Sequence, residues 1–430
     1  MPRAEHSISR SQISDNAVKV LYRLHQAGFQ ACLVGGGVRD LLLGREPKDF
    51  DIATSASPEE VRHLFRNCRL IGRRFRLAHV HFGPEIIEVA TFRGGNAEEN
   101  DPSDHRRDDD TGLVLRDNVW GTLEEDAFRR DFTVNALFYN IADFSVVDYT
   151  GGMDDLRQGV LRMIGDPHAR YREDPVRMLR AIRFAAKLGF TIDKASEAPI
   201  ADLKHLLADV PAARLFEEVL KLFMGAMAVQ SFELLRHYGL FAELFPQTET
   251  ALAQEEQNFP LTFVVQALKN TDARLSQGKH VTPAFLYAAL LWEPVRQQAE
   301  QLQTKGYSEH DALMIAGDEV WQRQQARVAI PRRFATPMRE IYQLQARLQF
   351  TKGKRAVRLL AHPRFRAAYD FLLLRAQSGE ADPALADWWT QFQEKDDNGQ
   401  QAAIREAGER RETRRRNRRG GRRRRPDTVA

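Results

Sequence analysis

Residues 34 to 51 read Val-Gly-Gly-Gly-Val-Arg-Asp-Leu-Leu-Leu-Gly-Arg-Glu-Pro-Lys-Asp-Phe-Asp. An apolar run, Ala31–Val34, leads into the three glycines. This order predicts a strand, a glycine turn, a short helix and a second strand that bears Asp49 and Asp51. Side chains at i and i+2 of a strand leave one face about 6.5 to 7 Å apart, so both carboxylates can reach metal ions about 3.5 to 4 Å apart. Phe50, between them, would face the core.

Neither half of this pattern is specific alone. An Asp-x-Asp pair is expected roughly once by chance in a chain of this length, and glycines form positive-φ turns in many folds. The glycine run also matches neither the phosphate loop of P-loop proteins nor the dinucleotide fingerprint. The order of the segments, continued by motifs further along the chain, therefore carries the prediction.

The composition indicates a globular protein of several domains. The chain has 430 residues, of which 43% are apolar, and two to four domains are expected. The longest apolar candidate for a membrane span, residues 285–292, is far shorter than the roughly 20 residues required, and residues 1–10 lack a secretion signal. We therefore expect no transmembrane segment and a cytoplasmic location. Cys32 and Cys68 are expected to be reduced, buried and structural.

The formal net charge of +4 conceals an asymmetry along the chain. Residues 410–425 hold eleven arginines and one acid, for +10, so the remaining residues carry −6. Such a block has no apolar face to bury, so we expect a disordered tail that binds the phosphates of RNA. A tail that only improves solubility is the alternative. The arginines assigned to RNA are Arg414, Arg415, Arg416, Arg418, Arg419, Arg422, Arg423, Arg424 and Arg425.

Short strands and helices alternate from about residue 30 to 150, whereas the chain reads helical from about 195 onward. In the strand predicted over residues 85–92, Glu88 stands between two apolar residues, where a charge is costly unless a cation meets it. It is therefore a candidate third carboxylate of a metal site, with a solvent-facing edge residue as the alternative. Further on, Arg129, Arg130 and Asp131 follow one another. This group forms either a surface ion-pair cluster or a site that neutralises a transferring phosphoryl group.

Residues 174–189 carry the marks of an amphipathic helix. Asp174 is predicted as the N-cap, Pro175 as the first helical residue and Gly189 as the C-terminal stop. A basic stripe, which includes Arg177, lies opposite the apolar face and next to Glu173. The stripe is either a solvated face or a source of donors and acceptors for a nucleotide base.

A second basic segment, residues 352–369, interleaves arginines and lysine with aromatics. This pattern indicates a surface for single-stranded RNA. The residues in question are Lys354, Arg355, Arg358, Arg364, Phe365 and Arg366.

Together and in order, these motifs resemble the bacterial poly(A) polymerase group of the nucleotidyltransferase superfamily, whose close relatives are the tRNA CCA-adding enzymes. The resemblance implies an α+β fold, with a polymerase β-like α/β head on a mixed sheet, an all-helical neck and body, and a disordered basic tail. The implied boundaries are 1–30 for a leader, 31–150 for the catalytic head, 151–225 for a neck that recognises the nucleotide base, 226–400 for an RNA-binding body and 401–430 for the tail.

The resemblance also implies the chemistry: an RNA 3′ hydroxyl attacks the α-phosphorus of ATP, with two Mg²⁺ ions held chiefly by Asp49 and Asp51. The third carboxylate stays open between Glu88 and Asp131. Expected partners are RNA 3′ ends and ATP, and RNA-decay proteins are left open. The nucleotide-binding residues implied are Gly35, Gly36, Arg39, Arg129, Arg130, Glu173, Asp174 and Arg177.

Two other functions fit the same sequence. Both relatives share the catalytic half, but residues 70–80 and the arginine tail are typical of the polyadenylating branch, so polyadenylation is favoured over CCA addition. A non-catalytic RNA-binding adaptor on the same fold is the second alternative. The intact Asp49 and Asp51 argue against it.

Overall fold

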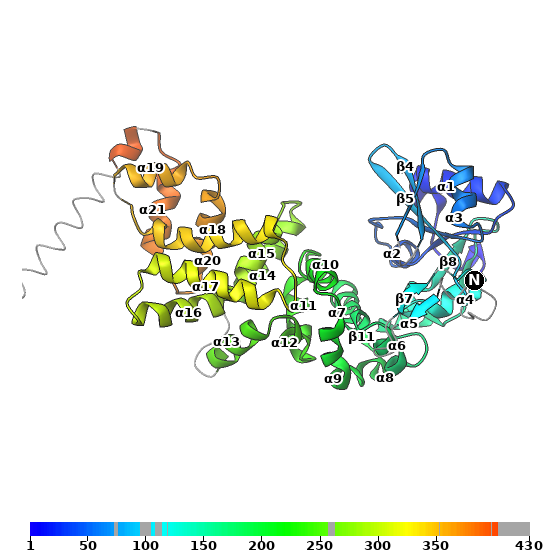
Figure 1. Ribbon diagram of the computed structural model, residues 1–430. Helices are drawn as coiled ribbons and strands as arrows, with labels where there is room; N and C mark the ends of the chain where they lie inside the picture. Colours follow the sequence, from blue (N-terminus) through cyan, green and yellow to red (C-terminus); the bar gives the residue numbers. More distant parts are fainter. Residues whose placement is uncertain are drawn as a thin grey trace, which may run out of the picture. The chain divides into compact units, whose positions relative to one another are not determined.

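The computed structural model describes residues 1–72, 76–94, 105–107, 114–117, 119–256, 263–351, 353–396 and 398–402. The chain divides into two compact units, Met1–Val210 and Pro211–Ala430 (Figure 1). The predicted tail and most of the polar loop after Gly94 lie outside the described residues. The five predicted domain boundaries remain predictions.

A mixed sheet forms the core of the first unit, as predicted. In the described residues it has seven strands in the order β3-β4-β5-β2-β1-β8-β9. The β2–β5 pair is parallel, and the other neighbours in this sheet are antiparallel. The strands are β1 Ala31–Val34, β2 Asp51–Thr54, β3 Cys68–Ile71, β4 Leu77–Phe82, β5 Glu85–Thr91, β8 Leu137–Asn140 and β9 Val146–Asp148. A separate antiparallel pair joins β6 His105–Arg107 to β7 Val114–Asp117.

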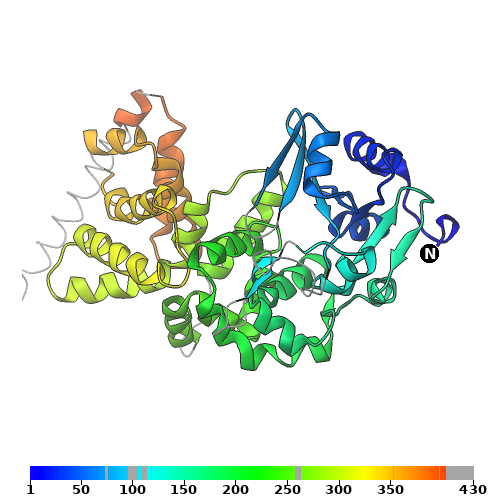
Figure 2. The same ribbon diagram turned by 45° about the vertical axis from the view of Figure 1, so that its right-hand side comes forward.

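Helices pack on this sheet and extend beyond it. α1 Asp15–Gln26 and α3 Pro58–Leu64 contact its strands, as both ribbon views show (Figures 1 and 2). α2 Gly36–Leu42 contacts β1, β8 and the 3₁₀ turn η3 Thr133–Asn135. The other elements of the unit are the 3₁₀ turns Arg3–Glu5, Arg10–Gln12 and Lys204–Asp209, the helices α4 Leu123–Arg129, α5 Gly152–Gln158, α6 Pro167–Glu173, α7 Val176–Leu188, α8 Lys194–Glu197 and α9 Ile200–Leu203, and the parallel pair β10 Val160–Leu161 with β11 Thr191–Ile192.

The predicted helix over residues 174–189 is α7, and its start differs slightly from the prediction. Asp174 ends α6, so Pro175 is the N-cap of α7 rather than its first helical residue. Gly189 closes the helix at φ 73°, in the left-handed region that glycine adopts without strain. The apolar face is buried as expected, including Met178 and Ile182.

The second unit is built from helices, with no strand among its described residues. Aromatic side chains fill its interior, where Trp292 packs edge-on against Phe371 at a centroid distance of 5.2 Å. The prediction of helices from about residue 195 onward is confirmed for the described residues. The helices are α10 Ala212–Phe223, α11 Ala228–His237, α12 Leu240–Leu244, α13 Pro246–Glu256, α14 Phe263–Ser276, α15 Pro283–Leu290, α16 Trp292–Thr304, α17 Glu309–Gln324, α18 Arg332–Leu348, α19 Lys354–Leu360, α20 Phe365–Gln377 and α21 Pro383–Gln393.

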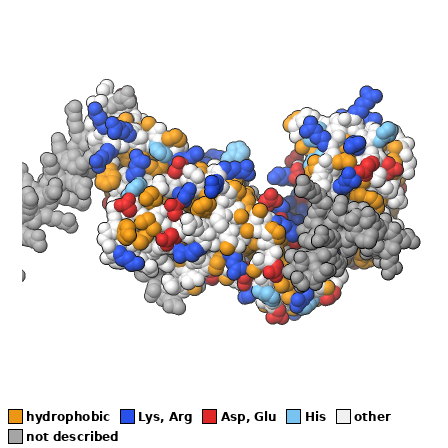
Figure 3. Space-filling view, in the orientation of Figure 1, with side chains coloured by type: hydrophobic (Ala, Val, Ile, Leu, Met, Phe, Trp, Pro, Cys, Tyr) orange, Lys and Arg blue, Asp and Glu red, His pale blue; other side chains and the backbone are white. Residues whose placement is uncertain are grey.

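Charged side chains of both signs are interspersed over the face seen in Figure 3. Within the described residues, no helix is long and apolar enough to cross a membrane. Cys32 is buried, which raises the pKa of its thiol to about 12. Cys68 is only partly buried, because it lies on β3 at the edge of the sheet, so the prediction that both cysteines are buried was wrong for Cys68.

Candidate active site

The glycine turn after β1 requires its first glycine. Gly35 is the N-cap of α2 at φ 69° and ψ −129°, a conformation strongly unfavourable for residues with a Cβ. A Cβ added at Gly35 would lie 3.6 Å from Nη1 of Arg130. The turn therefore brings the backbone at the end of β1 up to a guanidinium group, as a site for an anionic ligand would need.

Asp51 and Glu88 come together on neighbouring strands. Asp51 begins β2, and the parallel pairing of Ile52 with Val89 places Asp51 and Glu88 one residue earlier on each strand. Both line a cavity of about 370 Å³ at this end of the strands. Asp49 precedes the strand rather than lying within it, and Phe50 is only half-buried, so the expectation of a core-facing phenylalanine was too strong.

Electrostatics show that the three carboxylates are neighbours. Burial and the negative charges of Glu88 and Asp49 together raise the pKa of Asp51 to about 6, although Arg130 and His79 act in the opposite direction. His79, paired with Glu88 in the β4–β5 register, places Nε2 3.4 Å from Oε2 of Glu88. The sequence pattern alone gave His79 no place beside this site.

Arginines line the same cavity opposite these acids. Arg129, Arg130 and Arg177 were predicted, whereas Arg93 and Asp126 were not. Arg130 forms an ion pair with Asp126 at 2.8 Å and lies over the ring of Phe138 at 5.0 Å. Asp126 belongs to the charged run that precedes Arg129 in the sequence, so its position beside the predicted arginines could have identified it as a site residue. Arg93 gave none.

The predicted base-recognition residues form a compact group at the α6–α7 junction. Oε2 of Glu173 accepts from Nη1 of Arg170 at 2.8 Å and from Nη1 of Arg177 at 3.0 Å. Nη2 of Arg170 also donates to the carbonyls of Arg129 and Arg130, each at 2.7 Å. Burial and the positive charge of Arg177 lower the pKa of Arg170 to about 10. Arg170, which sequence reasoning missed, thus connects this junction to the arginines of the cavity.

Arg39 and Asp131 lie elsewhere, in a network between α2 and α7 that is buried around Arg39, Asp40 and Asn135 and reaches the surface at Arg180 and Lys187. Arg39 is 2% exposed, donates to Asp40 and to Asn135, and lies 5.2 Å from the ring of Phe184. Asn135 in turn donates to Asp131 at 3.1 Å. Arg180 pairs with Asp131 at 2.5 Å, and Lys187 pairs with Asp40 at 3.2 Å. We call these six the α2–α7 network: Arg39, Asp40, Asn135, Asp131, Arg180 and Lys187.

This arrangement separates the two candidates for the third carboxylate. Burial alone would raise the pKa of Asp131, but the positive charge of Arg180 and hydrogen bonds from Asn135, Arg180 and the Phe132 amide lower it to about 2. Asp131 does not line the cavity that holds Asp51, whereas Glu88 does. Arg39 likewise faces the network rather than the cavity. The basic stripe of α7 is therefore not simply solvated, because two of its members belong to the network.

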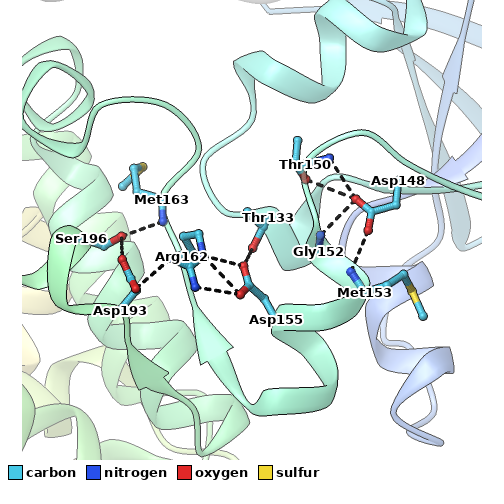
Figure 4. Close-up of polar contacts among 10 residues, drawn as sticks. All are labelled: Thr133, Asp148, Thr150, Gly152, Met153, Asp155, Arg162, Met163, Asp193 and Ser196. Carbon is cyan, nitrogen blue, oxygen red and sulfur yellow. Dashed lines mark hydrogen bonds and ion pairs between the residues drawn. The ribbon is translucent and has the colours of Figure 1, made fainter.

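A second polar cluster contacts η3 through Thr133 (Figure 4). The Thr133 hydroxyl donates to Asp155 at 2.7 Å, and Arg162 bridges Asp155 at 3.1 Å and Asp193 at 2.9 Å. An added Cβ at Gly152 would lie 2.2 Å from the carbonyl oxygen of Thr133, so only glycine fits there. Asn135 is therefore held by its own hydrogen bonds within the α2–α7 network and by the packing of Thr133, in the same 3₁₀ turn, against α5.

The residues fit a hard divalent cation. Oxygen ligands from carboxylates are those that Mg²⁺ prefers, and mutual repulsion among Asp49, Asp51 and Glu88 would be relieved by a cation. Within the part of the chain that the structure describes, no three metal-ligating side chains are already gathered at metal-binding distances. The tail arginines assigned to RNA lie outside the described residues.

Three family models match the chain along its length. They are the poly A polymerase head domain over residues 31–162, a probable RNA and SrmB-binding site of polymerase A over 189–252, and the polymerase A arginine-rich C-terminus over 305–425. The first of these covers the glycine turn, Asp49, Asp51 and Glu88, and the cavity arginines Arg93, Arg129 and Arg130, but not Arg177.

Full-length relatives and solved structures agree with these models. The chain is 52% identical over 414 residues to the poly(A) polymerase I of Escherichia coli O6:H1, covering 94% of this chain and 88% of that protein. It is 36% identical over 268 residues to a CCA-adding enzyme of Lactobacillus helveticus, covering 60% and 64%. The Thermotoga maritima CCA-adding enzyme complexed with tRNA has the same fold, with a TM-score of 0.56 at 19% identity over 91% of this chain and 84% of that chain. The chain is a member of the poly(A) polymerase family of nucleotidyltransferases.

Proposed function

We propose that this chain adds AMP from ATP to RNA 3′ ends without a template, and that the resulting tails promote RNA decay. One observation carries the proposal: Asp51 and Glu88 share a cavity with Arg129, Arg130 and Arg177. Carboxylates that can hold cations, facing guanidinium groups that can bind phosphates, form the arrangement that nucleotidyl transfer requires. The cytoplasm, which supplies both RNA and ATP, is the expected location.

In the proposed reaction, the RNA 3′ oxygen forms a bond to the α-phosphorus of ATP. The bond from that phosphorus to the bridging oxygen breaks, pyrophosphate leaves, and the hydroxyl proton passes to water. Two Mg²⁺ ions, held by Asp49 and Asp51 with Glu88 as the third carboxylate, would activate the hydroxyl and stabilise charge on the leaving group. Arg129 and Arg130 bind the triphosphate.

Residues at the α6–α7 junction select the base of the incoming nucleotide. Without a template, adenine must be read by protein donors and acceptors. Glu173, Asp174 and Arg177 supply both kinds of group, and Arg170 connects them to the backbone of the phosphate-binding arginines. Arg39 acts in this scheme as a positioning residue, since its guanidinium is used within the α2–α7 network.

A four-nucleotide extension assay tests the proposal. The chain is incubated with a generic RNA and each nucleoside triphosphate separately, and repeated incorporation from ATP alone is expected. Asp51→Asn should abolish it, whereas Asp154→Asn, at an exposed ion pair with Arg157 of the same unit, should not. Incorporation of CTP onto tRNA ends followed by a single AMP would replace the proposal with CCA addition. RNA binding without any incorporation would indicate an adaptor.

A further inference from the structure

A second cavity, of about 480 Å³, lies within the C-terminal unit, far along the chain from the candidate active site. Its lining residues come from α14, α15, α18 and α20 and the segments that flank them, and these four helices pack against one another (Figure 1). It falls outside residues 189–252, the segment matched as a probable RNA-binding site. Its volume is within the range typical of small-ligand pockets, about 300 to 1,000 Å³.

The sequence explains why these helices leave a space. Small side chains, Ala267, Ala284 and Ala367, lie where larger ones would fill the gap. Pro337 lies inside α18 at the cavity wall, where it has no amide hydrogen to donate and disrupts the regular helix. Phe285, half-buried, and Leu373 give the cavity apolar walls.

Cations and one acid surround these walls. Arg274 is exposed and donates from Nη2 to the carbonyl of His280 at 3.3 Å. Arg364 pairs with Glu340 at 3.1 Å outside the cavity lining, and Arg366 pairs with Asp370 at 3.1 Å within it. Three guanidinium groups therefore meet a single lining carboxylate, so the cavity favours an anionic ligand with an apolar body.

We propose that this cavity holds one unpaired base of single-stranded RNA, with adenine preferred over uracil. The apolar walls contact the faces of the base, Arg274 and Arg366 bind the flanking phosphates, and Asp370 accepts a hydrogen bond from the exocyclic amino group that adenine has and uracil lacks. The inference rests on RNA being the substrate of the proposed function, and it makes the product tail itself a ligand.

The structure also corrects the aromatic part of the sequence-based RNA surface. Phe365 and Tyr369 belong to a buried core cluster and stack on each other at 6.0 Å, so they cannot serve as platforms for bases. Arg364 and Arg366 of the same segment do reach the cavity, where Phe285 of α15 provides the aromatic wall instead. The two arginines are close together in the sequence, whereas the aromatic wall comes from about 80 residues earlier in the chain, so the sequence pattern could not predict it.

Fluorescence anisotropy of labelled oligo(A) and oligo(U) with the full chain tests this, at a salt concentration that screens the arginine tail. Arg274→Ala, which removes a phosphate contact, and Ala367→Leu, which fills the space, should each weaken oligo(A) binding about 5-fold or more. Arg347→Ala is the matched control, because Arg347 is exposed on α18 of the same unit but does not line the cavity. Equal effects of Arg274→Ala and Arg347→Ala would overturn the proposal.

Base preference and ligand source are separate readouts. Asp370→Asn should bring the oligo(A) and oligo(U) affinities closer together, and an unchanged ratio would contradict the assigned role of Asp370. Free AMP should compete far more weakly than oligo(A), since it carries one phosphate instead of the two that flank a base within a chain. Competition as strong as that of the oligonucleotide would identify a free-nucleotide site instead. These measurements need no incorporation of AMP, so failure of the cavity proposal and failure of the proposed function remain distinguishable.

Discussion

At the scale of single residues, the site depends on which carboxylate joins Asp49 and Asp51. Glu88→Gln should lower kcat about 100-fold or more and raise the Mg²⁺ concentration needed for half-maximal rate, because it removes a metal ligand worth several kcal/mol. Asp131→Asn should leave that Mg²⁺ dependence unchanged. Steady-state rates over a Mg²⁺ titration decide between them, and the opposite pattern would assign the third carboxylate to Asp131.

Asp131 should instead report on acid stability. Its folded pKa of about 2 lies below its ordinary value of 3.8, so the unfolded state binds a proton first as the pH falls. The partners of the Asp131 carboxylate, net of its burial, thus contribute about 2 kcal/mol that is fully present above pH 3.8 and is lost as the pH falls toward 2. Unfolding free energies of the parent and Asp131→Asn should differ near neutral pH and converge in acid. A constant difference would contradict this assignment.

The motif residues were predictable from the sequence to the extent that their position depended on local structure. Asp51 and Glu88 each occupy a strand position whose face follows from the two-residue period. Arg39 was predicted to bind the triphosphate, but its burial depends on Asn135 and Phe184, which lie about a hundred residues or more further along the chain. No periodicity reveals such a partner.

At the scale of secondary-structure elements, the contact between α5 and η3 leaves no room for a side chain at Gly152. Gly152→Ala would place a Cβ 2.2 Å from the Thr133 oxygen, so the two elements must separate, at a cost of about 1 to 3 kcal/mol. Thermal unfolding should show the lower stability. Gly225→Ala is the control, because its added Cβ would have its nearest neighbour at 3.4 Å. Equal melting temperatures for the two variants would show that η3 accommodates the change.

Element types were largely predictable, whereas element ends were not. The strands Ala31–Val34 and Glu85–Thr91 and the helix α7 lie where periodicity placed them. The start of α7 moved by one residue because Asp174 closes the preceding helix, which the sequence did not show as a separate element. The β2–β5 parallel pairing that brings Asp51 to Glu88 is a long-range contact, so the period within each strand could not predict it.

At the scale of the whole molecule, charge is divided between a mildly acidic body and an arginine-rich tail. Truncation after Gln400 should lower RNA affinity and reduce its salt dependence, because the eleven arginines no longer release counterions. ATP affinity should stay nearly unchanged. Filter binding of RNA across a salt series and ATP titration of both proteins check this. Equal losses in both affinities would show that the tail contributes to the catalytic half.

The central claim is that Asp49 and Asp51, with Glu88, hold divalent cations against a bound triphosphate. A crystal structure with Mn²⁺ and a non-hydrolysable ATP analogue tests it most directly, since Mn²⁺ is located by its anomalous signal. We predict cation density bridging these carboxylates and the triphosphate, with Arg129 and Arg130 on the phosphate oxygens. A triphosphate bound elsewhere, or no cation at Asp49 and Asp51, would contradict the account.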